Sequence, residues 1–169
     1  MTKLILNKKK ILEYQQNRSP YLFIDYAEVD PRNFANGYKE LKSDEWFFKV
    51  HWPNDPNMPG ALQMESMVQM AALMLLTAPN QKGKLVYLIS TEKLELKKKV
   101  VPNNKMYIKT EMLKYNRGIA KCSANCSIDN QIMSSSLFTI LLPDEIKKFT
   151  KKKCQLALRY LKNQDLLKN

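Results

Sequence analysis

The apolar positions of this chain are continuous in one segment and alternate in others. Residues 60–76 are apolar on almost every face of a helix, and such a helix is buried in a core. Residues 119–128 alternate small apolar side chains with polar ones, which predicts a strand with one buried face. Further strands are expected at 85–96, 106–115 and 132–142, with hairpin turns at 116–118 and 129–130. The sequence therefore predicts an antiparallel sheet packed on a central helix.

The first part of the chain is less regular. Tyr21, Phe23 and Ile24 are aromatic or β-branched, and they predict a first strand. Residues 38–41 predict a weak strand, and residues 11–16 a short helical turn. All of this segment is interpreted as scaffold for the sheet.

The length of 169 residues fits one domain. Pro143 ends the strand pattern, and the two acidic residues that follow favour a helix start. We expect residues 1–143 to form the domain and residues 144–169 to form a basic extension, helical over 144–162. The net charge of +12 comes mainly from the two ends of the chain. No stacking motif or recognition helix accompanies these lysines, so a nucleic-acid partner is not expected.

Three cysteines, an odd number, argue against a disulfide framework. Cys122 and Cys126 are four residues apart on one predicted strand, roughly 13 Å, which is too far for a bridge. Both are interpreted as core residues in a reduced, cytoplasmic compartment. No apolar run reaches about 18 residues, so no transmembrane helix is expected, and the first apolar stretch is too short for a secretory signal.

The clearest chemical signal is the segment Glu45–Gln69, which contains the only histidine, His51. Three prolines follow His51 within nine residues, and we expect the loop over 51–58 to be extended and stiff. Gly60 then begins the buried helix, where the first backbone N–H groups are free.

Glu65 and Gln69 lie four residues apart on that helix and are therefore neighbours. A buried carboxyl without a basic residue nearby needs a partner or a raised pKa. The segment thus holds a candidate general base, an oxyanion donor and a general acid. A histidine among prolines is more often structural, and a single helical glutamate usually faces water, so the pattern matters more than either residue.

The pattern E-x-F-F-x-x-H-W-P-x-x-P-x-M-P-G-x-L-x-x-E-x-x-x-Q over residues 45–69 resembles the (3R)-hydroxyacyl-acyl-carrier-protein dehydratases of bacterial fatty-acid synthesis. A similar segment, R-S-P-Y-L-F-I-D, precedes it at 18–25. The resemblance covers about residues 17–142 and implies an α+β hot-dog fold, a long helix wrapped by a curved antiparallel sheet.

The same resemblance implies the reaction and its residues. A 3-hydroxyacyl thioester is dehydrated to the trans-2-enoyl thioester. His51 removes the α-proton, Glu65 protonates the leaving hydroxyl, the amide of Gly60 binds the thioester oxygen, and Gln69 orients Glu65. Neither a metal nor an organic cofactor is needed.

The resemblance also implies partners. The substrate arrives on acyl carrier protein, which is acidic, and Lys97, Lys98 and Lys99 could attract it, although a lysine run is commonly only a solvated surface. Met58, Met64 and Met67 are candidates for the wall of an acyl tunnel, or plain core residues. A homodimer is implied, with the histidine and the acid of one site from different subunits, or a hexamer made of three such dimers.

Two other classes stay open. Hot-dog acyl thioesterases share the fold but lack the His-to-Glu pattern, and a non-catalytic acyl-binding subunit would not need both acidic and basic groups. Asn54-Asp55 replaces a pair that usually contains glycine, and Asn103-Asn104 replaces Gly-Asp. These departures leave the acyl length and the pathway open.

Overall fold

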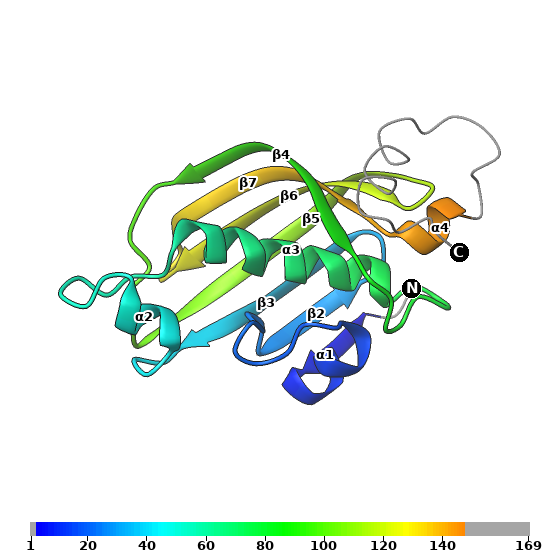
Figure 1. Cartoon of the computed structure of the whole chain (residues 1–169). Coiled ribbons are helices and arrows are strands. Elements are labelled where there is room, and N and C mark those ends of the chain that lie inside the picture. Colours follow the sequence, from blue (N-terminus) through cyan, green and yellow to red (C-terminus); the bar gives the residue numbers. More distant parts are fainter. Residues whose placement is uncertain (1–2, 148–169) are drawn as a thin grey trace.

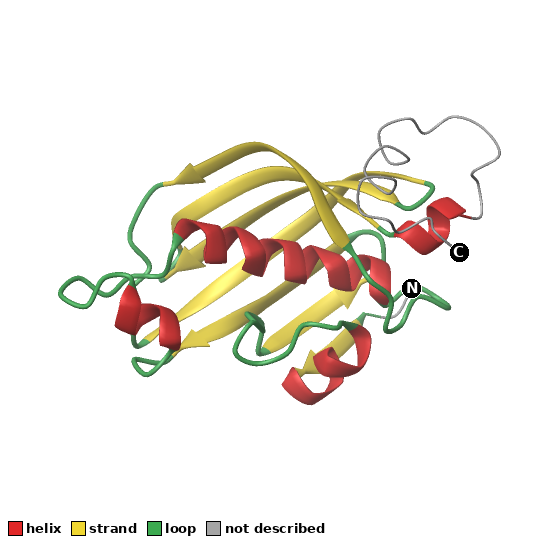
Figure 2. Ribbon diagram, viewed as in Figure 1, coloured by secondary structure: helices red, strands yellow, loops and turns green. Residues whose placement is uncertain are grey.

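The computed structural model describes residues 3–147 and consists of a seven-stranded antiparallel sheet with one long helix lying across it (Figure 1). The sheet has the strand order β1-β2-β3-β5-β6-β7-β4, so β1 and β4 are its edges. The strands are β1 Leu4–Asn7, β2 Tyr26–Asp30, β3 Phe34–Leu41, β4 Tyr87–Leu96, β5 Asn104–Asn116, β6 Ile119–Ile128 and β7 Gln131–Leu141. The helices are α1 Lys8–Tyr14, α2 Trp46–Val50, α3 Gly60–Leu76 and α4 Pro143–Lys147. Figure 2 shows the sheet curving behind α3.

The α3 helix is the centre of the core. Fourteen of its 17 residues are buried, which confirms the expectation from a helix that is apolar all round. Burial of each large apolar side chain contributes roughly 1.5–3 kcal/mol relative to exposure. The helix ends at the C-cap Thr77, whose N–H bonds the Leu73 carbonyl.

Small residues on the inner face of the sheet let it approach α3 closely. A Cβ atom on Gly37 of β3 would lie 2.8 Å from the Met70 Cε on α3 and 1.9 Å from the Tyr26 carbonyl oxygen, so only glycine fits there. On β6, Cys122 and Cys126 are fully buried, as expected of core residues. Burial raises the pKa of Cys122 to about 12 and that of Cys126 to about 11, which keeps both thiols protonated.

The strands of the second half lie where the apolar pattern predicts them. The expected strands 85–96, 106–115, 119–128 and 132–142 correspond to β4, β5, β6 and β7. In the connecting turns Arg117, Gly118, Asp129 and Asn130 have positive φ angles, as the hairpin interpretation requires. The weak strand expected at 38–41 is the second half of β3.

The expected first strand at Tyr21–Ile24 is wrong. This segment is irregular, and the first strand is β1, which pairs with β2. The Phe23 N–H bonds the Gln69 side-chain oxygen at 2.9 Å instead of a neighbouring strand. Leu22, Phe23 and Ile24 are buried, as the residues of a strand would be. The sequence pattern therefore does not distinguish this irregular segment from a strand. The helical turn expected at 11–16 is α1, which begins at Lys8 after the N-cap Asn7.

Two further differences lie beside the candidate site. The short helix α2 was not expected from the sequence. The loop after it is not extended, because Trp52 and Asp55 bond each other's backbone, N–H to carbonyl, at 3.4 and 3.0 Å and turn the chain back. Prolines fix φ locally but leave room for such a turn between them.

The start of the expected C-terminal extension is helical in α4, and the rest of it lies outside the described residues. Glu145 of α4 accepts hydrogen bonds from Tyr115, Gln81 and Arg32, the last at 3.0 Å. These contacts fix the beginning of the extension to β5 and to the turn before β3. Within residues 3–147, no helix is long and apolar enough to cross a membrane.

Candidate active site

His51 is the C-cap residue of α2, and its backbone N–H bonds the Phe47 carbonyl at 2.9 Å. The loop that follows closes on it, because the Asn57 N–H bonds the His51 carbonyl at 3.1 Å. The imidazole stacks on Trp52 with 4.5 Å between the ring centroids. The ring is therefore fixed by its own loop and is half-buried.

The hydrogen bond of the imidazole fixes its tautomer. His51 Nδ1 lies 3.2 Å from the carbonyl oxygen of Asn57. A carbonyl oxygen only accepts, so in neutral His51 the proton is on Nδ1 and the lone pair is on Nε2. Nε2 is then the nitrogen available as a general base.

Gly60 is the first residue of α3, and Pro59 is the N-cap, without a side-chain cap bond. The Pro59 carbonyl accepts from the N–H groups of Leu62 and Gln63 at 2.9 and 3.1 Å. Within residues 3–147, the N–H of Gly60 has no such acceptor, as is usual at a helix N-terminus. This amide is available to an oxyanion.

Leu96 of β4 lies directly on Gly60, and sequence reasoning did not single it out. A Cβ atom on Gly60 would lie 2.3 Å from Leu96 Cδ1. Glycine at this position therefore has a packing reason as well as a chemical one. Nothing in the sequence pattern around Leu96 points to Gly60.

Glu65 is half-buried on α3, and the expected contact with Gln69 is present. Gln69 Nε2 donates to Glu65 Oε1 at 2.9 Å, and Asn17 Nδ2 lies 3.5 Å from the same oxygen. Asn17 was not singled out from the sequence, since nothing in the pattern around it points to Glu65. Burial raises the pKa of Glu65, and the hydrogen bond from Gln69 opposes this. The net effect is a raised pKa, so Glu65 keeps its proton to a higher pH than an ordinary glutamate, as suits a general acid.

The structure does not join His51 to Glu65. Within the described part of the chain, the hydrogen bond and the ring stacking of the His51 side chain are with its own loop, and the Glu65 side chain bonds Asn17 and Gln69. The helix α2, which His51 caps, and α3, which carries Glu65, lie on the same side of the sheet (Figure 1).

The remaining predicted residues surround this region. Met58, Met64 and Met67 belong to the core cluster, with exposed fractions of 1%, 6% and 0%. The Met58 N–H bonds the Val100 carbonyl at 2.7 Å, which ties the histidine loop to the corner after β4.

Lys97, Lys98 and Lys99 form that corner and are exposed. Lys99 is paired with Asp55 of the histidine loop, and Lys97 lies 3.9 Å from Glu95. Lys98 forms no ion pair within residues 3–147.

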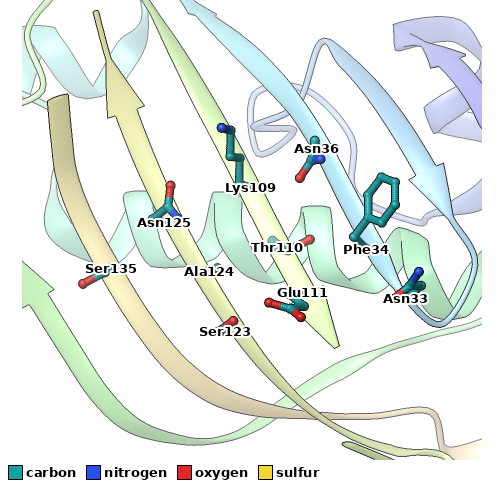
Figure 3. A pocket seen from close by; sticks show the side chains of 10 residues that line it. All are labelled: Asn33, Phe34, Asn36, Lys109, Thr110, Glu111, Ser123, Ala124, Asn125 and Ser135. Carbon is teal, nitrogen blue, oxygen red and sulfur yellow. The ribbon is translucent and has the colours of Figure 1, made fainter. Parts of the chain in front are cut away.

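A shallow pocket of about 390 Å³ lies on the opposite face of the sheet from α3 (Figure 3). It is lined by Asn33, Phe34, Asn36, Lys109, Thr110, Glu111, Ser123, Ala124, Asn125 and Ser135. The sheet separates this pocket from His51 and Glu65, so it is not part of the candidate active site.

Known proteins resemble this chain over most of its length. A family model described as FabA-like domain matches residues 24–136. The 3-hydroxyacyl-[acyl-carrier-protein] dehydratase FabZ of Clostridium novyi is 33% identical over 140 residues, which cover 81% of this chain and 99% of that protein. The dehydratase of the same name from Caldicellulosiruptor bescii is 34% identical over 128 residues, which cover 75% and 91%.

Solved structures show the same fold. One is titled the dehydratase heterocomplex ApeI:P from Xenorhabdus doucetiae, with a TM-score of 0.69 at 13% identity over 84% of this chain and 97% of that chain. Another is a hypothetical thioesterase protein with coenzyme A from Streptococcus pneumoniae, with a TM-score of 0.54 at 11% identity over 69% and 83%. At these identities the likeness shows the fold alone, which is the expected hot-dog fold.

The family model covers the histidine loop, the start of α3, and both Glu65 and Gln69, so the match includes the candidate site. The resemblance found in residues 45–69 is thereby confirmed, and the chain belongs to the FabA-like family, together with the FabZ dehydratases that it matches.

Proposed function

We propose that this protein is a 3-hydroxyacyl-acyl-carrier-protein dehydratase of fatty-acid or related acyl biosynthesis. The observation that carries the proposal is a half-buried glutamate with a raised pKa, five residues after a helix start with a free amide, in a chain of the FabA-like family. A carboxyl with a raised pKa keeps its proton to higher pH, which suits the protonation of a leaving hydroxyl. The protein acts in the cytoplasm and needs no cofactor.

The proposed reaction uses three groups. His51 Nε2 takes the α-proton, and the electrons of that C–H bond form the C2–C3 double bond. The C3–O bond breaks as Glu65 gives its proton to the hydroxyl, which leaves as water. The N–H of Gly60 binds the thioester oxygen, where negative charge develops as the proton leaves.

We further propose that a homodimer forms the site, with His51 and Glu65 of one site from different subunits. The separation of their contacts within one chain supports this. The edge strand β4 carries exposed Leu94 and Leu96, and Trp52 is also exposed at 57%. An unpaired edge with apolar side chains is suited to a second copy of the chain.

Acyl carrier protein is the proposed source of the substrate, and the corner of Lys97, Lys98 and Lys99 is its proposed docking site. The corner is tied to the histidine loop by Met58 and Lys99, so a carrier bound there would lie beside the site. Met58, Met64 and Met67 are proposed to shape the space for the acyl chain, since methionine adapts to flexible apolar groups.

A hydration assay tests the function. Crotonyl thioester is added to the purified protein, and loss of the enoyl absorbance is followed together with release of free thiol. We expect the absorbance to fall without release of thiol. Thiol release without hydration would indicate a thioesterase instead, and the absence of both signals with carrier-bound substrates of several lengths would contradict the enzymatic proposal.

A further inference from the structure

Two amide groups converge on one oxygen of Glu65. Gln69 Nε2 lies 2.9 Å from Glu65 Oε1, and Asn17 Nδ2 lies 3.5 Å from it. Within residues 3–147, Glu65 Oε2 has no hydrogen-bond partner. The two oxygens of this carboxyl therefore differ in their surroundings.

The orientation of the Gln69 amide is fixed by the backbone around it. Its Oε1 accepts the Phe23 N–H at 2.9 Å, so its NH₂ group must point the other way. That NH₂ donates one hydrogen to the Tyr21 carbonyl at 2.9 Å and the other to Glu65 Oε1. Glu65 Oε1 is consequently an acceptor in this contact.

Asn17 is placed by the segment that joins α1 to β2, which passes along α3 (Figure 1). The guanidinium of Arg18 donates to the carbonyls of Gln15 and Asn17 at 2.8 and 2.9 Å and so bridges the backbone on either side of Gln16. The Gln15 N–H in turn bonds the Ile11 carbonyl at the end of α1. These bonds hold the backbone of Asn17, whose amide reaches Glu65 Oε1 at 3.5 Å.

We propose that Asn17 is a positioning residue that, together with Gln69, occupies Oε1 of Glu65 and leaves Oε2 to carry the transferred proton. In the elimination the Oε2–H bond breaks, the proton joins the leaving hydroxyl to form water, and the carboxylate remains bound to both amides through Oε1. This inference rests on the proposed function. Tyr21 is also near Glu65, and its pKa is raised by burial and by the charge of Glu65.

The titration of Glu65 tests the contact without reference to activity. The carboxyl carbons of glutamate are labelled with ¹³C, and the Glu65 signal is assigned by its loss in E65Q. An amide donor stabilises the carboxylate, so N17A should raise the pKa of Glu65. N17D has nearly the same shape but adds a like charge, and should raise that pKa further. Q16A is the matched control, because the Gln16 amide bonds the Gly83 carbonyl at 2.7 Å and does not touch Glu65.

The kinetics then test the role. N17A should lower kcat roughly tenfold with KM within about twofold, the size expected for one lost hydrogen bond to an ionisable group. Its activity should also persist to higher pH, because the dehydration rate falls as Glu65 loses its proton. A residue with only a structural role would lower kcat and leave that pH limit in place.

The possible failures are distinct. An active enzyme whose Glu65 titrates alike in the wild type, N17A and N17D would overturn the role of Asn17 alone. A protein in which the titration moves as expected but no enoyl thioester is hydrated would overturn the proposed function, and the proton-donor role with it.

Discussion

The chemistry available to His51 and Glu65 is decided by the atoms of each side chain that are already bonded. His51 Nδ1 is hydrogen-bonded to the Asn57 carbonyl, so Nε2 is the basic atom. The amides of Gln69 and Asn17 donate to Glu65 Oε1, so Oε2 is the oxygen without an amide partner. His51 is held by its own loop, and Glu65 by the amides of Gln69 and Asn17. In the proposed reaction, therefore, neither group needs to reorganise before it reacts.

Removal of either group should abolish most of the activity. His51→Ala and Glu65→Ala are each expected to lower kcat for hydration by about 10²- to 10⁴-fold, the usual contribution of a general acid or base. Both positions are half-buried, and unfolding curves should show that the variants remain folded. A variant that keeps more than about a tenth of the wild-type rate would remove that residue from the mechanism.

Glu65→Gln should change the stability of the protein in a pH-dependent manner. The pKa of Glu65 is raised by burial, so the folded state favours the neutral carboxyl. The stability that this provides is complete below the pKa of an unfolded glutamate, about 4.3. It is lost as the pH rises through the raised pKa of the folded state. The uncharged Glu65→Gln variant should therefore gain stability over the wild type at about pH 8, and this difference should shrink near pH 4.

Glu13→Gln is the matched control in the same denaturant unfolding experiment. Glu13 is exposed, and its hydrogen bond and ion pair with Lys82 lower its pKa. Its replacement should give no gain at pH 8. If Glu65→Gln changes the unfolding free energy equally at both pH values, the carboxyl of Glu65 is not destabilised by burial.

Among the secondary-structure elements, α3 and β4 together form the proposed oxyanion position. The helix supplies the free amide of Gly60, and β4 supplies Leu96, which packs on the same residue. A Cβ atom at position 60 would displace the end of the Leu96 side chain.

Gly60→Ala should lower both stability and activity. The new Cβ would meet Leu96 Cδ1, and overpacking of this kind costs roughly 1–3 kcal/mol. The shifted amide should also lower kcat by at least about tenfold. Leu96→Ala in the same chain should restore part of the unfolding free energy, because it removes the clash. Additive effects of the two substitutions, measured by a double-mutant cycle, would show that the contact is not what excludes a side chain.

The lysine corner after β4 gives a prediction for the carrier protein. Changing Lys97, Lys98 and Lys99 to Glu should raise KM for carrier-bound substrate roughly tenfold, and this effect should weaken with added salt. KM for a short coenzyme A substrate should change much less. Because Lys99 is paired with Asp55, Lys98 alone should account for a large part of the effect.

The matched control changes three other exposed lysines, Lys9, Lys10 and Lys114, to Glu. It alters the net charge by the same amount and leaves the corner intact. Equal effects of the two triple variants on carrier-bound substrate would make the corner a solvated surface without a docking role.

Some secondary-structure elements could be predicted from the sequence and others could not. The bounds of β6 could be predicted because a period of two over ten residues is set by one buried face. The irregular backbone of residues 21–24 could not be predicted, because Leu22, Phe23 and Ile24 are buried as strand residues would be. The Phe23 N–H bonds Gln69, 46 residues away, instead of a neighbouring strand. The short helix α2 also escaped, since five mostly aromatic residues show no helical period.

Some contacts of the candidate site could also be predicted from the sequence, and others could not. The Glu65–Gln69 contact follows from helical spacing alone. Other contacts depend on how loops and strands return to the helix, and no local pattern predicts them. These are the contacts of Asn57 with His51, of Leu96 with Gly60 and of Asn17 with Glu65.

The assembly of the site from two chains gives the last prediction. His51→Ala and Glu65→Ala proteins, each inactive alone, are unfolded together and refolded. In a two-fold dimer with shared sites, a mixed dimer has one site that lacks both residues and one intact site. Random pairing makes half of the dimers mixed, so activity should recover to roughly a quarter of the wild-type value. Were both residues of a site from one chain, every site would carry a lesion and activity would stay at background. Background activity, with exchange of subunits shown by mass, would thus rule out the shared site while leaving the dehydratase chemistry in place.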